Sequence, residues 1–200
     1  MLRLVDRSKV LLALLRWLSD LFAKQRGLPA CIYRLGTITA HSKTGIHGNE
    51  HDFFLSFLKG CIQLEVVPKC EGSTNLAPID YVSQALVYLS LQNDLLGGTF
   101  HLYNPQNVYW NDIFNIIRKL GYKIKVTDHQ EWLLKLKQQI SQGKGNALSP
   151  FLSNLKKEEF LFSPKLSARN TLKILAKISI ICPPINEKII SNYLEFFMKT

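Results

Sequence analysis

The residues of this chain best suited to contact a ligand follow a short apolar run at positions 30–33; they are Leu35, Gly36, Thr37 and Ile38. The run contains a β-branched and an aromatic residue and lies between turn residues, which favours a buried strand over a helix. In open α/β sheets, ligands bind beyond the carboxyl ends of strands, and a glycine there allows close backbone approach or a positive φ. We therefore predict a contact site at these four residues; the alternative is an ordinary strand and loop without a ligand.

Histidines and cysteines are the residue types here that coordinate transition metals; the relevant ones are His41, His47, His51, Cys31, Cys61, Cys70 and Cys182. The histidines share one polar loop but have no acidic partner at ligand spacing, and the cysteines form no Cys-x-x-Cys pair. Three of the cysteines have apolar neighbours, which is typical of reduced core residues in a cytoplasmic protein. We predict no metal site and a cytoplasmic location.

The size and charge of the chain limit its partners. With 200 residues, 46% of them hydrophobic, the chain is expected to form one domain with a sizeable core. No apolar stretch approaches the ~20 residues that span a bilayer, so no membrane partner is expected. The net charge of +10 suits an anionic partner, but the lysines are scattered and the longest basic run is Lys156-Lys157, so nucleic acid is not expected.

Hydrophobic periodicity and turn residues place the elements that must position the candidate site. Apolar positions at helical spacing predict helices over 8–25, 51–63, 81–91, 110–120, 131–140, 151–161, 170–178 and 185–198. Strands are predicted at 30–33, 99–103 and 122–127, and residues 66–77 are expected to be extended. Asp80 is expected to cap the helix that begins at Tyr81, and the Gly-, Ser- and Asn-rich segment 141–149 is predicted to be a flexible loop.

This order of strands and helices with a helical tail predicts an α/β fold with a helical cap. Three strands are too few for a complete doubly wound domain. The glycine-rich strand–turn–helix that normally holds a dinucleotide pyrophosphate is also absent from the sequence.

Several segments, taken in order, resemble the C-terminal half of thioester reductase domains, which end nonribosomal peptide and polyketide synthases and carboxylic acid reductases. The segments are RGLPACIYRLGTITAHSKTG, NEHDFFLSFLKGCIQLEVVP, NLAPIDYVSQALVYLS, GGTFHLYNP and ARNTLKILAKISIICPPINEKIISNYLEFF. The resemblance covers about residues 26–198 and implies a partial Rossmann-like parallel sheet of the extended short-chain dehydrogenase type. Residues 1–106 would then be the C-terminal part of the NAD(P)-binding unit, and residues 107–200 a mainly helical substrate-side lobe.

The resemblance also implies a reaction. In the family, NADPH reduces an acyl or peptidyl thioester held on the phosphopantetheine of a carrier protein, and an aldehyde or alcohol is released. Leu35, Gly36, Thr37 and Ile38 match the family loop beside the nicotinamide, so they are the implied cofactor contacts.

The sequence departs from the family at its catalytic motif. The family's Tyr-x-x-x-Lys would place its tyrosine at Val5 or Leu12, neither of which can donate a proton, so no catalytic residue is carried over. We expect the chain to be inactive and not to bind NADP(H) unless a separate chain supplies the N-terminal half. The alternatives are a non-catalytic module that docks an acidic acyl carrier protein and a fragment of a fatty acyl-CoA reductase-like enzyme.

Overall fold

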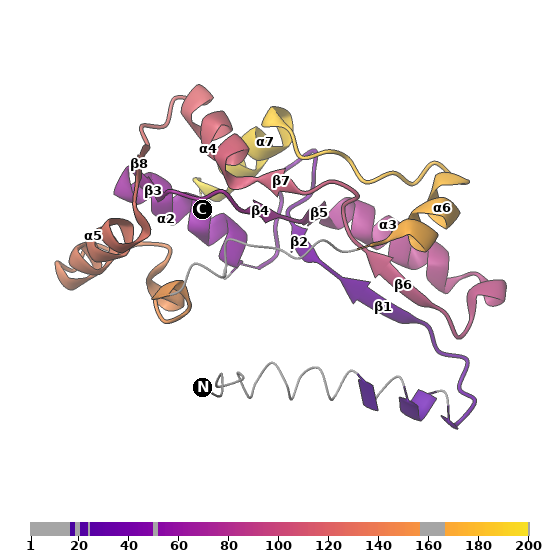
Figure 1. The fold of residues 1–200 in the computed structure, drawn as a ribbon. Coiled ribbons are helices and arrows are strands. Elements are labelled where there is room, and N and C mark those ends of the chain that lie inside the picture. Colours follow the sequence, from indigo (N-terminus) through magenta and orange to yellow (C-terminus); the bar gives the residue numbers. More distant parts are fainter. Residues whose placement is uncertain (1–16, 19–20, 24, 50–51, 157–166, 200) are drawn as a thin grey trace.

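The computed structural model describes residues 17–18, 21–23, 25–49, 52–156 and 167–199 (Figure 1). Within the helix predicted over 8–25, the described residues are helical, and the others lie outside the described part of the chain. The strands are β1 (Ile32–Leu35), β2 (Thr37–Thr39), β3 (Val66–Pro68), β4 (Ser73–Thr74), β5 (Leu76–Pro78), β6 (Thr99–Leu102), β7 (Val108–Tyr109) and β8 (Lys125–Thr127). The α-helices are α2 (Phe53–Leu64), α3 (Ile79–Ser90), α4 (Trp110–Lys119), α5 (His129–Ser141), α6 (Arg169–Ala176) and α7 (Glu187–Phe197).

The strands pair mainly in parallel, as the α/β prediction requires. β1 pairs with β6, β2 with β5 and β3 with β8, all parallel, whereas β4 and β7 form an antiparallel pair. Parallel strands need crossover connections, and α2 and α3 lie in such connections. The prediction of a partial Rossmann-like parallel sheet followed by a mainly helical region is confirmed. No helix in the described ranges has the length and apolar character needed to cross a bilayer.

The extended segment around Gly36 differs from the prediction. The predicted strand at 30–33 begins two residues later, at Ile32, and the loop expected after Gly36 is instead the strand β2. Thr37 and Ile38 are β-branched and pair in register with Leu76 and Ala77 of β5. Strand partners distant in sequence therefore extend a segment that local turn signals had divided.

Two hydrophobic clusters form the core. The first packs α2, α4, α5 and α7 together through aromatic side chains, with the Phe57 ring 5.0 Å from that of Trp110 and 5.8 Å from that of Trp132. The second packs β5, α3, β6 and the Leu175 side chain of α6. In Figure 1, α2, α4 and α5 lie toward the left and α3, β6 and α6 toward the right, with α7 and β5 between them.

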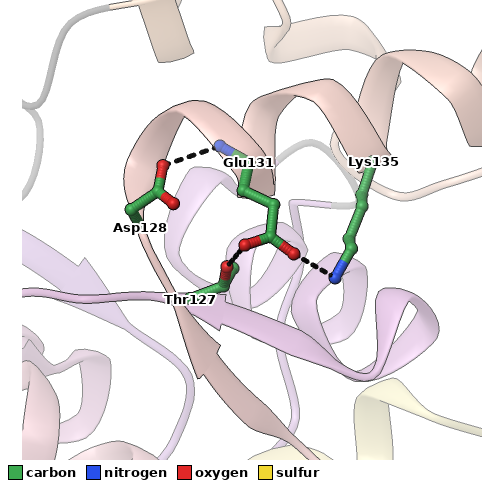
Figure 2. A network of polar contacts seen from close by, with 4 residues as sticks. All are labelled: Thr127, Asp128, Glu131 and Lys135. Atoms are coloured by element: carbon green, nitrogen blue, oxygen red, sulfur yellow. Dashed lines mark hydrogen bonds and ion pairs between the residues drawn. The ribbon is translucent and has the colours of Figure 1, made fainter.

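The start of α5 shows how local sequence sets a helix boundary (Figure 2). The Asp128 carboxylate accepts a hydrogen bond of 2.9 Å from the backbone N–H of Glu131, which satisfies one free donor of the first turn. The Glu131 carboxylate accepts a hydrogen bond from the Thr127 hydroxyl and pairs with Lys135 at 2.7 Å. The helix therefore begins at His129, two residues before the predicted start.

The segment after α5 was predicted to be flexible, but its middle is anchored to α2. Asn146 and Leu148 are buried, and the Asn146 amide donates a 3.1 Å hydrogen bond to the Gly60 carbonyl. The prediction of a helix over 151–161 is also wrong for residues 151–156, the part of this range that the structure describes. Residues 149–151 and 154–156 form short 3-10 helices, and residues 157–161 lie outside the described part.

Substitution of Gly60 by alanine should destabilise the fold. A Cβ at Gly60 would lie 2.6 Å from Asn146 Oδ1 and 2.6 Å from Leu148 Cγ, so the anchored segment would have to move. We expect a loss of about 1–3 kcal/mol in the free energy of unfolding, measured by urea denaturation. Gly48→Ala is the matched control, because nothing lies within 4 Å of its Cβ position; equal losses in both variants would contradict the close packing at Gly60.

Candidate functional site

A pocket lies beyond the carboxyl ends of the parallel strands β2 and β5, where open α/β sheets bind ligands. Its volume is about 330 Å³, and it is lined by Ile38, Thr39, Ala40, Ile46, His47, Gly48, Asn49, Asp52 and Ile79. These residues come from the end of β2, the loop that follows it, and the starts of α2 and α3. The strand ends therefore define one candidate site.

The structure separates the four residues predicted to contact a cofactor. Ile38 lines the pocket, whereas Leu35 and Thr37 are exposed and lie outside its lining. Gly36 is packed against the protein itself, since a Cβ there would lie 2.8 Å from the Tyr103 ring. The absence of a side chain at Gly36 therefore serves the packing of Tyr103 as well as any approach of a ligand.

Asp80 holds the loop that follows β2. Its carboxylate accepts hydrogen bonds from Ser42, 2.9 Å from the backbone N–H and 2.6 Å from the hydroxyl. The prediction that Asp80 caps α3 is wrong: the N-cap residue is Pro78, and Asp80 lies in the first turn. Burial raises the pKa of Asp80, but the hydrogen bonds from Ser42 outweigh it, and the pKa lies below its ordinary value.

The C-terminal helix holds the same loop from the other side. The Asn192 amide of α7 donates hydrogen bonds to the carbonyls of Ser42 at 2.8 Å and Lys43 at 3.0 Å. The hydroxyls of Tyr193 and Thr39 share a buried hydrogen bond of 2.8 Å. Gly45 adopts a φ of +68°, and a Cβ there would overlap the backbone carbonyl of Asn192. The pocket wall is thus fixed by residues about 150 positions apart.

Two titratable side chains line the pocket, Asp52 and His47. Burial raises the pKa of the Asp52 carboxyl above its ordinary value, although the Leu55 N–H bond and the nearby His47 oppose this. Asp52 is also the N-cap of α2, since it accepts a 2.8 Å hydrogen bond from the Leu55 N–H. The cap accounts for its position, while its raised pKa in a pocket is a feature of functional sites that sequence spacing did not reveal.

Two buried asparagines, Asn75 and Asn104, lie near the point where β1 pairs with one strand, β6, and β2 with another, β5. Asn75 and Asn104 exchange hydrogen bonds of 2.8 and 3.0 Å through side chain and backbone, and the Asn104 amide also donates to the Leu76 carbonyl at 2.8 Å. The sequence gives no local indication of a role for Asn75, because the division of this extended segment into β4 and β5 on either side of it depends on distant partner strands.

These residues fit only part of a nicotinamide cofactor site. Leu35 and Thr37 at the ends of β1 and β2 are exposed, and Ile38 lines the strand-end pocket. The sequence has no glycine-rich loop that would cradle phosphates, and the described ranges contain no group of three or more metal-ligating side chains. The arrangement can therefore shape one side of a bound ligand.

The fold matches that of the extended short-chain dehydrogenase-type reductase domains. A family model described as "Male sterility protein", an NAD-binding family, matches residues 20–86. A linear gramicidin synthase from Brevibacillus parabrevis is 30% identical over 189 residues, which are 89% of this chain and 4% of that protein.

The chain is also similar to reductase domains of known structure. The terminal R domain of the myxalamid PKS-NRPS pathway is 34% identical with a TM-score of 0.74, over 88% of this chain and 45% of that one. An archaeal thiolation-reductase di-domain shares the fold at 22% identity, with a TM-score of 0.71 over 90% of this chain and 38% of that one. The chain is therefore related to the terminal reductase domains of nonribosomal peptide and polyketide synthases, and the resemblance to thioester reductase domains is confirmed. It spans less than half the length of either solved protein.

Replacement of Asp80 by asparagine should remove the pH dependence of the Ser42 hydrogen bonds in the loop after β2. Because the folded pKa of Asp80 lies below its ordinary value of 3.8, its bonds to Ser42 persist at neutral pH and are lost as the pH falls through that lower pKa. The backbone amide resonance of Ser42, followed by NMR, should titrate below about pH 4 in the native protein and not in Asp80→Asn. A Ser42 titration that persists in the variant would contradict the role of Asp80. Asp112→Asn, on the exposed side of α4, is the control.

Proposed function

We propose that this chain is the C-terminal portion of an NAD(P)H-dependent thioester reductase, which releases an acyl or peptidyl group from a carrier protein as an aldehyde or alcohol. The observation that carries the proposal is the 34% identity to a terminal R domain over 88% of the chain. The strand-end pocket agrees with it, because ligands of this fold class bind at that edge.

In this proposal, residues 1–106 complete the nucleotide-binding unit and residues 107–200 form the substrate-side lobe. The two parts meet at the loop after β2, which Asp80 holds from one side and Asn192 from the other. When bound, NADPH supplies a hydride to the thioester carbonyl. Leu35, Gly36, Thr37 and Ile38 line the nicotinamide side, and the fixed loop keeps the carbonyl oriented toward it.

In this proposal, the residues that bind the cofactor phosphates and the residue that donates the proton belong to an N-terminal half that these 200 residues do not include. The sequence has neither the glycine-rich loop nor the Tyr-x-x-x-Lys motif of the family. We infer that the 200 residues alone do not reduce a thioester, and that a partner segment, on the same polypeptide or another, completes the site.

Calorimetric titration with NADPH tests this inference. The 200-residue protein alone should show no micromolar binding and no thioester reduction. Addition of a polypeptide that carries the N-terminal half of a related reductase domain should produce both. Micromolar binding and turnover by the 200 residues alone would refute the inference.

The reconstituted pair also tests the cofactor contacts. Thr37→Ala and Leu35→Ala should weaken NADPH binding by about threefold to thirtyfold, the range expected for one lost contact. Val87→Ala, at an exposed position on α3, is the matched control and should leave binding unchanged. If the Thr37 and Leu35 variants bind as the control does, these residues only shape the strand.

A second candidate function is the docking of an acidic carrier protein without catalysis. The net charge of +10 favours it, because long-range attraction speeds the encounter with an acidic partner. Association of the 200-residue protein with an acyl carrier protein should weaken by roughly tenfold between low salt and about 0.5 M salt. Surface plasmon resonance measures this, and no association at low salt would remove the candidate.

A further inference from the structure

A second, larger pocket lies between α2, the end of α7 and residues 145–151, which include the 3-10 helix at 149–151. Its volume is about 610 Å³. Its lining includes three phenylalanines, Phe151, Phe196 and Phe197, together with Lys59. The size falls within the range of pockets that hold small molecules. Apolar rings beside one ammonium group suit a ligand with an apolar body and an anionic end.

The polar side chains in the walls of this pocket are largely engaged by the protein itself. The Gln63 side-chain oxygen accepts a 2.8 Å hydrogen bond from the Ala147 N–H. The Asn146 amide donates to the Gly60 carbonyl and, at 3.3 Å, to Gln139. These side chains therefore serve the structure of the wall, and Lys59 supplies the positive charge of the lining.

Lys59 keeps donor capacity for a ligand. Its ammonium donates a 3.2 Å hydrogen bond to the Phe197 carbonyl and lies 5.0 Å from the centre of the Phe197 ring. An ammonium has three N–H donors, and in the part of the chain that the structure describes no carboxylate pairs with Lys59. A half-buried ammonium that no carboxylate among the described residues neutralises favours an anion from outside.

We propose that this pocket binds an apolar chain that ends in a carboxylate, with the chain against the phenylalanine rings and the carboxylate on Lys59. The pocket adjoins the strand-end pocket, because His47 lines both. If the proposed function holds, the ligand is the far end of an acyl group that bears its own carboxylate, with its thioester near Ile38. That identification rests on the proposed function, whereas binding of a free carboxylate does not.

Octanoate and octanol, which share an apolar chain and differ in charge, are the probes. Binding is followed by NMR through the backbone amides of Gly145, Ala147 and Phe197. Octanoate should bind about tenfold more tightly than octanol, the difference expected for one hydrogen bond to a charged group. The test needs no NADPH, so failure of the proposed reductase function would not affect it.

Variants distinguish the contribution of the Lys59 charge to binding from that of the apolar lining of the pocket. Lys59→Met should remove the preference for octanoate and leave octanol binding within about twofold, while Lys59→Arg should keep the preference. Phe151→Ala should weaken both probes, and Lys119→Met, at an exposed lysine on α4, should weaken neither. Thermal melting confirms that each variant is folded.

Three results would overturn the proposal. They are equal binding of the two probes by the native protein, equal weakening of both probes by Lys59→Met, and shifts at none of the three amides. If Lys59→Met does not fold, the comparison of the two probes in the native protein and in Lys59→Arg decides the question.

Discussion

One extended segment with two different partners is the constraint on which this structure depends. Residues 32–35 pair with β6 and residues 37–39 pair with β5, so the segment changes partner at Gly36. Tyr33 of the first half and Ile38 of the second both pack against the core around α3 and β6, and Ala40, just after the second half, belongs to the core around α2 and α7. The Asn75–Asn104 hydrogen bonds satisfy backbone groups where the partners diverge. The strand-end pocket lies immediately after this change of partner.

Elements with a strong local pattern could be predicted from the sequence. The helix at 110–120 is an example, since Ile113, Phe114 and Ile117 recur at helical spacing and all three are buried. The parallel α/β class also followed from the order of strands and helices. These features depend on neighbours a few residues away, which a sequence displays directly.

Features that depend on distant partners could not be predicted. Asp80 looked like a helix cap because its partner, Ser42, lies 38 residues earlier. Thr37 and Ile38 looked like a loop because their pairing strand lies near residue 76. The hydrogen bonds from Asn192 to the loop after β2 join positions about 150 residues apart, so no local sequence pattern indicates them. Of the four predicted cofactor contacts, the lining of the pocket includes only Ile38, because the strand continues past Gly36.

The hydrogen bonds that the Asn192 amide donates to the loop go to main-chain oxygens, those of Ser42 and Lys43. The shape of the loop is thereby uncoupled from the identity of Lys43 and Ile46, whose side chains are exposed. Ile46 also borders the pocket. A substitution at Ile46 would therefore reshape the border of the pocket, while the main-chain hydrogen bonds that hold the loop stay in place.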